Sequence, residues 1–127
     1  MVRERIRSAS PFEDRYGFSR AVRVGRSVHV AGTAPIPQDG SPPPPDPYDQ
    51  MMLCGQIALE ALQRLGAEGA DVVRTRMFIT DPGYADRVGT AHRDLFGAAA
   101  PAATMVVVAA LLDPAWKVEI EVEAVTG

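Results

Sequence analysis

Three glutamates near the C-terminus have the spacing that most strongly suggests chemistry. Glu119, Glu121 and Glu123 alternate with apolar residues, which is the period-two pattern of a strand with one core face and one polar face. Same-face neighbours along a strand lie roughly 6.6 Å apart, so the three charges repel one another unless cations, other partners or solvent lie opposite them. The sequence therefore predicts an acidic row on the last strand, and we expect the functional site there.

Two arginines offer a structural explanation for that row. A strand is predicted at Val72–Thr80, along which side chains alternate between two faces. Arg74 and Arg76 share one of these faces. The other, more apolar face carries Val73, Thr75, Met77 and Ile79. If the two strands are neighbours, the arginines oppose the carboxylates as cross-strand partners.

The cysteine and the histidines do not predict a metal site. Cys54 is the one cysteine, which excludes an internal disulfide and fits a reducing compartment. His29 falls on a predicted strand, where partial exposure is expected, and His92 on a predicted helix, off its apolar side, where we expect it to be solvated. No second histidine or cysteine has metal-ligand spacing to His29, so no metal is expected.

Length and charge limit the class of protein. The 127 residues suffice for one domain, residues 1–127, with a modest core. The net charge of -3 gives no general attraction to nucleic acid or to an anionic membrane. No segment resembles a signal peptide, and no apolar run approaches about 20 residues. A soluble cytoplasmic protein that does not enter a membrane is therefore expected.

Alternating patterns and turn residues predict the first part of the fold. Residues 3–7 form either a short edge strand or a mobile basic terminus. Phe18–Val24 and Ser27–Thr33 are predicted to pair as a hairpin around a tight turn at residues 25–26. Pro35–Pro47, with four consecutive prolines, is predicted to be a surface loop.

Two helices follow in the prediction. The first begins near Asp46 to Asp49 and ends at Leu65, before Gly66. Its apolar positions are Met52, Ile57, Leu59, Leu62 and Leu65. The second helix spans Tyr84–Phe96. Its expected buried side consists of Tyr84, Val88, Ala91, Leu95 and Phe96.

An apolar run completes the pattern. Residues 104–112 are nearly all aliphatic, which is typical of a strand buried on both faces, so this strand is predicted at the centre of the sheet. The order of elements indicates an α+β fold with two helices on one face of a mixed sheet. The other face carries too many aliphatic residues to be fully solvated, so we expect self-association, with clefts between subunits as pockets for a small ligand.

Five ordered stretches give the chain a family resemblance. They are Tyr16–Val22, Val30–Thr33, Asp71–Asp81, Pro101–Thr104 and Val118–Glu121. In order and spacing they resemble the RidA (YjgF) family over nearly the whole chain. The resemblance implies a chorismate-mutase-like fold with a mixed six-stranded sheet, and a homotrimer with a central barrel and three ligand clefts between subunits. It also implies cofactor-free hydrolysis of enamines and imines, which releases ammonia and a 2-oxo acid.

The resemblance assigns roles to individual positions. Glu119 falls on the glutamate that orients or deprotonates the attacking water. Ala103 falls where active members have an arginine, whose guanidinium holds the substrate carboxylate through two charge-assisted hydrogen bonds. The other substrate-binding positions that it implies are Phe18, Ala31, Gly32, Gly89 and Met105. Among them Phe18 replaces a tyrosine, Ala31 a serine and Gly89 an asparagine.

These departures predict a changed substrate. A hydrogen bond to a charged group contributes about 1.5–3 kcal/mol, so loss of the arginine lowers carboxylate affinity by roughly ten- to a hundredfold. We expect weak or absent activity on imines of ordinary 2-amino acids, and hydrolysis of a neutral or more apolar imine by Glu119. Arg20, Arg74 or Arg76 entering the cleft is the alternative, since any of them could replace the missing anchor.

Two further function classes stay open. The first is a non-catalytic trimer that binds a small apolar metabolite or regulates it. The second is RNA cleavage, suggested by the endoribonuclease name that some relatives carry. The acidic charge balance and the lack of a His-His or His-Lys pair in any motif argue against RNA cleavage.

Overall fold

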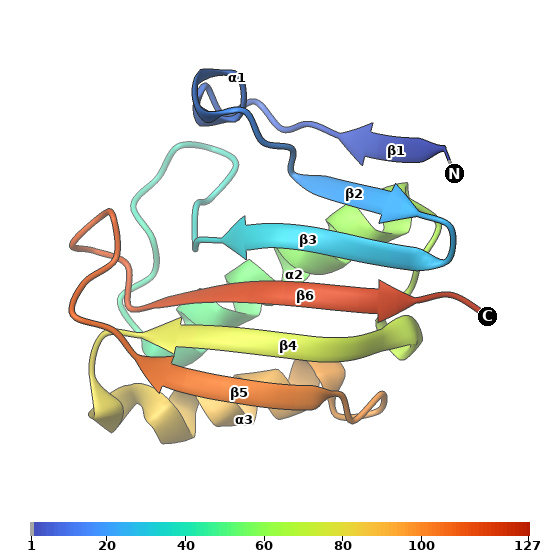
Figure 1. The fold of residues 1–127 in the computed structure, drawn as a ribbon. Coiled ribbons are helices and arrows are strands. Elements are labelled where there is room, and N and C mark those ends of the chain that lie inside the picture. Colours follow the sequence, from blue (N-terminus) through green and yellow to red (C-terminus); the bar gives the residue numbers. More distant parts are fainter. Residues whose placement is uncertain (1) are drawn as a thin grey trace.

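The computed structural model describes residues 2–127 and contains one six-stranded mixed sheet. Its strands are β1 (Arg3–Ile6), β2 (Ala21–Val24), β3 (Ser27–Thr33), β4 (Val72–Ile79), β5 (Ala102–Val107) and β6 (Val118–Val125). The helices are α1 (Phe12–Tyr16), α2 (Pro47–Arg64) and α3 (Ala85–Phe96), with single 3-10 turns η1 (Gly69–Asp71) and η2 (Pro82–Tyr84). The strand order is β1-β2-β3-β6-β4-β5, as Figure 1 shows.

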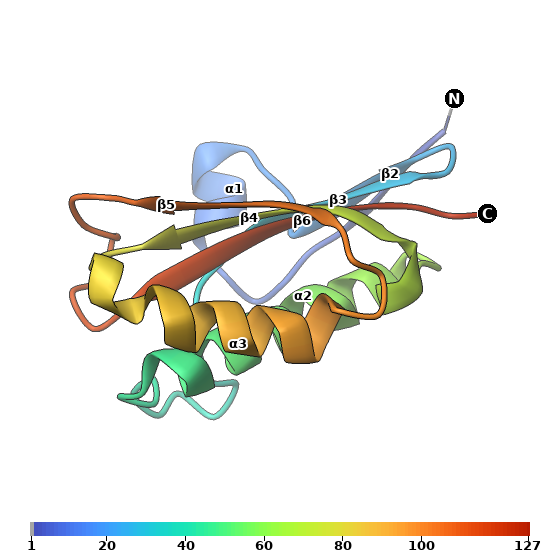
Figure 2. The ribbon, with the colours of Figure 1, turned by 90° about the horizontal axis from the view of Figure 1, so that it is seen from below.

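The layers agree with the predicted architecture. Strands β4 and β5 run parallel and are joined through α3, whereas the other neighbouring pairs are antiparallel. Figure 2 shows α2 and α3 together on one face of the sheet. The short α1 lies on the other side and was not predicted, because five residues are too few to show a helical period. No helix within residues 2–127 is both long and apolar enough to cross a membrane.

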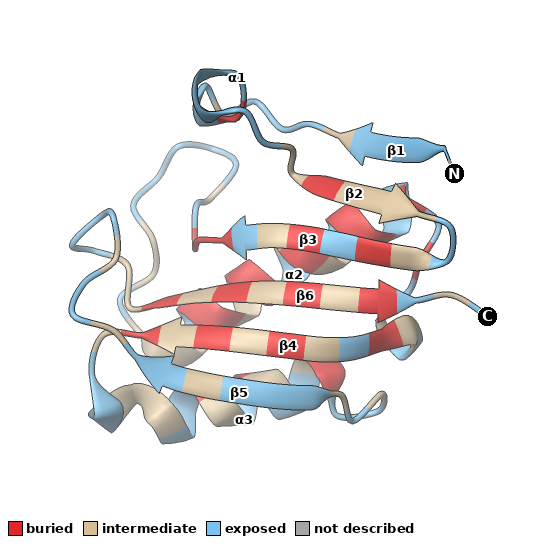
Figure 3. Ribbon diagram, in the orientation of Figure 1, coloured by how far each residue is buried: buried red, intermediate tan, exposed pale blue. Residues whose placement is uncertain are grey.

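Strand β6 is the centre of the core. It lies between β3 and β4, and its helix-facing residues Val118, Ile120, Val122 and Ala124 are almost completely buried. The intervening glutamates are half-buried on the open face. Figure 3 shows this alternation along the strand. The predicted period-two pattern is therefore confirmed, and β6 holds the acidic row in the middle of the sheet.

The predicted position of the apolar run was wrong. Strand β5 ends at Val107 and forms an edge of the sheet, with Val106 at 41% and Val107 at 53% exposure. The rest of the run continues into a loop in which Leu112 is 97% exposed. A hydrophobic run records that a segment avoids water, but it does not say whether the same chain or another one covers it. An uncovered apolar edge strand is prone to pair with a further chain.

The buried side of α2 also differs from the prediction. Met52, Ile57 and Leu59 are half-buried, and the fully buried stripe contains mainly small residues. It consists of Gln50, Met51, Cys54, Gly55, Ala58, Ala61 and Leu62. A Cβ atom at Gly55 would lie 2.2 Å from Leu95 Cδ1, so α2 and α3 pack more closely than larger residues allow. Close helix packing selected the small residues over the larger aliphatic ones.

Candidate functional site

The strand register places each glutamate of β6 opposite a different residue of β4. Glu123 pairs with Arg74, Glu121 with Arg76, and Glu119 with Phe78. The arginines thus oppose the acidic row as predicted, except at Glu119, where a half-buried aromatic side chain stands instead. The break was visible in the sequence, since arginine occurs at residues 74 and 76 but not at residue 78.

Ion pairs occupy the other two glutamates. Arg76 Nη1 lies 3.3 Å from Glu123 Oε1 and 3.8 Å from Glu121 Oε1. His29 Nδ1 lies 3.7 Å from Glu123 Oε1. Within residues 2–127, Glu119 has no such ion pair. Glu119 therefore differs from its neighbours on the same strand.

On the side away from β4, Glu119 lies next to a bulge in β3. The register between β3 and β6 shifts between Val30 and Thr33, at Ala31 and Gly32. Glu119 Oε2 lies 3.4 Å from the point where a Cβ atom on Gly32 would stand. Because glycine has no side chain, the carboxylate lies against the backbone of the bulge.

Arg20 fastens that bulge. Its Nη2 donates hydrogen bonds to the carbonyl oxygens of Ala31 at 2.6 Å and Gly32 at 3.0 Å, and to Thr33 Oγ1 at 2.7 Å. Its Nε is buried and has no hydrogen-bond partner in the described chain. Burial lowers the pKa of Arg20, while the nearby negative charges of Glu13 and Glu119 raise it. The guanidinium remains a cation, placed close to Glu119 but bonded to backbone.

The surroundings of Glu119 make it a weaker acid than an ordinary glutamate. Burial raises its pKa, the Arg20 charge opposes that rise, and the Glu121 charge adds to it. A carboxylate with a raised pKa binds a proton more readily and is a stronger base when ionised. The site can therefore accept a proton from water or from a bound molecule.

The predicted binding residues do not all lie with Glu119. In β5, Ala103 pairs with Thr75 and Met105 with Met77, and Thr75 and Met77 belong to the buried, helix-facing side of β4. Ala103 and Met105 are therefore on the helix side of the sheet. Gly89 belongs to α3 on the same side, and no atom lies within 4 Å of a Cβ position there. Within one chain, the sheet separates these three positions from Glu119.

The remaining predicted positions belong to β3 and to the segment that precedes β2. Ala31 and Gly32 are in the bulge that Arg20 binds. Phe18 lies between α1 and β2, and it is exposed rather than part of the predicted strand. Arg74 donates to Thr104 Oγ1 at 2.8 Å. Of the three arginines considered as replacement anchors, Arg20 is the one whose charge influences Glu119.

The prediction that His92 is solvated was wrong. His92 Nε2 lies 2.7 Å from Oγ1 of the fully buried Thr75. The ring also packs against Phe96, with centroids 5.3 Å apart, and burial lowers the pKa of His92. A hydroxyl on the core face of a strand needs a hydrogen-bond partner. The predicted core position of Thr75 therefore indicated that a polar side chain such as His92 would contact it.

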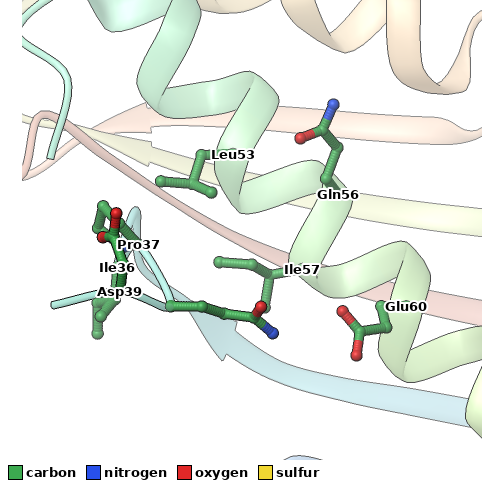
Figure 4. A pocket seen from close by; sticks show the side chains of 8 residues that line it. Ile36, Pro37, Asp39, Leu53, Gln56, Ile57 and Glu60 are labelled. Atoms are coloured by element: carbon green, nitrogen blue, oxygen red, sulfur yellow. The ribbon is translucent and has the colours of Figure 1, made fainter. Parts of the chain in front are cut away.

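One hollow of the single chain lies away from the predicted site. It has a volume of about 390 Å³ and is formed by the loop after β3 and the outer surface of α2 (Figure 4). It is lined by Ile36, Pro37, Gln38, Asp39, Leu53, Gln56, Ile57 and Glu60. No predicted site residue belongs to it. Within residues 2–127, no group of three or more histidine, cysteine, aspartate or glutamate residues is placed to hold a metal ion.

The sheet order and the two helices on one face define a YjgF-like α+β protein. The family model described as endoribonuclease L-PSP matches residues 9–126. The structure of Rv2704 from Mycobacterium tuberculosis, described as a member of the YjgF/YER057c/UK114 family, is 41% identical and covers 98% of this chain and 100% of its own, with a TM-score of 0.89. This chain belongs to the endoribonuclease L-PSP family, also called the YjgF or RidA family.

Two further relatives extend the comparison. YyfA from Yersinia pestis, described as a protein of unknown function of the Rid family, is 26% identical, with 98% of this chain and 100% of its own covered and a TM-score of 0.85. Protein SCO2049 from Streptomyces coelicolor is 38% identical over 123 residues, or 97% of this chain and 92% of its own, and is described as uncharacterized. These descriptions assign no reaction to the two relatives.

Proposed function

We propose that this chain hydrolyses an imine or enamine, with Glu119 as the base that activates water. The observation that carries the proposal is the contrast along β6. Glu121 and Glu123 have ion-pair partners, whereas Glu119 is half-buried without one and has a pKa that burial raises. A positioned base with a pKa raised towards neutrality suits general-base catalysis.

The proposed reaction uses one proton acceptor and no cofactor. Glu119 takes a proton from water, and the hydroxide adds to the imine carbon while the nitrogen receives the proton from Glu119. A second proton then passes from the new hydroxyl to the nitrogen. The carbonyl forms, the carbon–nitrogen bond breaks, and ammonia leaves.

The proposal places the complete site between copies of the chain. Glu119 and Gly32 lie at the open face, whereas Ala103, Met105 and Gly89 lie on the helix side. Two copies can bring these groups together where one cannot. The exposed apolar edge at β5 supports such an assembly, and we propose the homotrimer with a central barrel that the family resemblance implies.

The proposed substrate carries no carboxylate next to the imine. Ala103 offers a methyl group where a guanidinium would hold one. Arg76 is paired with glutamates, and Arg74 is bonded to Thr104. The Nη2 of Arg20 is bonded to the β3 bulge. These arginines therefore have other partners, which favours a neutral imine.

The test compares two imines and two glutamates. An amine oxidase supplies a neutral imine, an amino-acid oxidase supplies one with a carboxylate, and ammonia release above the spontaneous rate is measured. We expect turnover of the neutral imine, and a loss of roughly 10²–10⁴-fold in Glu119→Gln. Glu121→Gln makes the same charge change on the same face and should retain most activity. Equal losses in both variants would contradict the assignment to Glu119.

Folding stability separates loss of chemistry from loss of structure. Because the folded-state pKa of Glu119 is raised, the stability linked to its protonated form is lost as pH rises through that pKa. At neutral pH the ionised side chain therefore opposes folding. Glu119→Gln should melt at no lower a temperature than the wild type. A clearly lower melting temperature would mean that the carboxylate has a structural role.

RNA cleavage is the weaker candidate. The family model carries an endoribonuclease description, but His29 lies on the open face of β3 and His92 on α3 at the helix side. The two histidines of one chain therefore do not form an acid–base pair. Structured RNA incubated with the purified protein should stay intact. Cleavage that disappears in Glu119→Ala would favour the nuclease instead.

A further inference from the structure

A polar pair crosses the otherwise apolar layer between the sheet and α3. Thr75 points from β4 into this layer and is fully buried, and its hydroxyl lies 2.7 Å from His92 Nε2. The His92 ring packs on Phe96, so its position is fixed on two sides. The described residues offer no hydrogen bond to its other ring nitrogen, Nδ1. That nitrogen is available to a ligand.

The surroundings of this pair leave room beside it. Ala103 is the β5 partner of Thr75 and is exposed. Gly89 lies one turn before His92 on α3, and a Cβ atom there would meet nothing within 4 Å. Neither position has a side chain beyond Cβ. Met105, next on the same face of β5 and packed against the core, provides an apolar wall.

We propose that His92, oriented by Thr75, selects the ligand of this site by hydrogen bonding to a neutral polar group such as an amide or ester. The proposal rests on the proposed function for the location of the site and deepens it by naming the substrate class. A neutral imidazole has one donor and one acceptor nitrogen, and the Thr75 hydroxyl can either donate or accept. His92 Nδ1 can therefore serve as donor or acceptor, whereas a guanidinium only donates and always carries charge.

The test is a binding preference, which does not require turnover. Pyruvamide and pyruvate have nearly the same shape and differ in charge. Their dissociation constants are measured by titration at about pH 8, where an imidazole is neutral. Wild-type protein should bind pyruvamide more tightly than pyruvate. The preference should fall by roughly threefold to tenfold in the double variant His92→Phe/Thr75→Val, as expected for one hydrogen bond.

The double variant is designed to fold. It removes both members of the hydrogen bond together, so that no buried polar atom is left without a partner, and its melting temperature is measured alongside. His29→Phe, on the open face, is the matched control and should keep the preference. Ala103→Arg should reverse the preference towards pyruvate, because it adds a cation beside the pair.

Several outcomes would overturn the proposal. They are a wild-type preference for pyruvate, an unchanged preference in a folded double variant, or no binding of either compound up to its solubility limit. If imine turnover depends on Glu119 but the protein does not prefer pyruvamide to pyruvate, only the proposed role of His92 is rejected. A preference without any turnover would reject the hydrolase and leave the binding site.

Discussion

Glu119 and Glu121, two positions apart on the same strand, have opposite surroundings. Glu121 faces Arg76 and contacts its guanidinium, whereas Glu119 faces Phe78 and the glycine of the β3 bulge. The side chains, the strand and the face of the sheet are the same. What differs is the residue supplied by each neighbouring strand, so the chemistry of this site is set by the neighbours of the carboxylate.

Among substitutions that leave Glu119 in place, the largest effect is expected when its surroundings are made like those of Glu121. Phe78→Arg would place a guanidinium opposite Glu119, as Arg76 stands opposite Glu121. An opposite charge at this distance lowers the pKa of a carboxylate and weakens it as a base. We expect imine turnover at neutral pH to fall roughly tenfold or more, but by less than the 10²–10⁴-fold loss expected when the base is removed altogether. Carbon-13 NMR of the glutamate carboxyl groups reports the accompanying fall in the Glu119 pKa.

The matched control for this prediction is Phe78→Leu. It removes the aromatic ring without adding charge, so the Glu119 pKa should stay raised and turnover should be largely retained. If Phe78→Leu loses as much activity as Phe78→Arg, the ring itself contacts the substrate. The contrast between paired and unpaired glutamates would then not explain the activity.

Local patterns in the sequence predicted much of this arrangement. The alternation in residues 118–125 placed the glutamates on one face, and the alternation in residues 72–80 placed Arg74 and Arg76 opposite them. Both predictions depend on side-chain period within a strand, which the sequence carries directly. The family resemblance drew attention to Glu119, and the register then distinguished it from Glu121.

Other features depend on contacts between distant segments, and these were missed. The aliphatic run in β5 lies at an edge, and its hydrophobicity could not reveal that the cover is absent within one chain. The contact of His92 with Thr75 joins a helix to a strand 17 residues away. The buried stripe of α2 follows from the approach of Leu95 to Gly55. Periodicity within one element does not specify its partner.

A smaller effect is expected at the arginine nearest to Glu119. Arg20→Met removes the positive charge that lowers the Glu119 pKa, so that pKa should rise further. The acid side of the pH–rate profile should move to higher pH, because the base must be ionised to act. The protein should also lose about 1.5–3 kcal/mol of stability, since the carbonyl oxygens of Ala31 and Gly32 lose a charged donor.

Arg20→Lys separates these two effects. It keeps the positive charge but not the planar donor group. The Glu119 pKa should therefore stay close to its wild-type value while stability still falls. An unchanged pKa in Arg20→Met, measured by carbon-13 NMR, would show that Arg20 acts on the bulge alone.

The smallest effect is expected from removing Arg76, which pairs with Glu121 and Glu123. Arg76 and its two glutamates are each more than a third exposed, and exposed ion pairs contribute about 0.2–1 kcal/mol. Arg76→Gln should therefore lower the free energy of unfolding in urea by no more than about 1 kcal/mol, and added salt should reduce the difference. Imine turnover should remain near the wild-type level, because Glu119 keeps both Gly32 and Phe78 as neighbours. A loss of turnover comparable to that of Phe78→Arg would mean that the two ends of the acidic row act together, and that Glu119 owes its properties to the whole row.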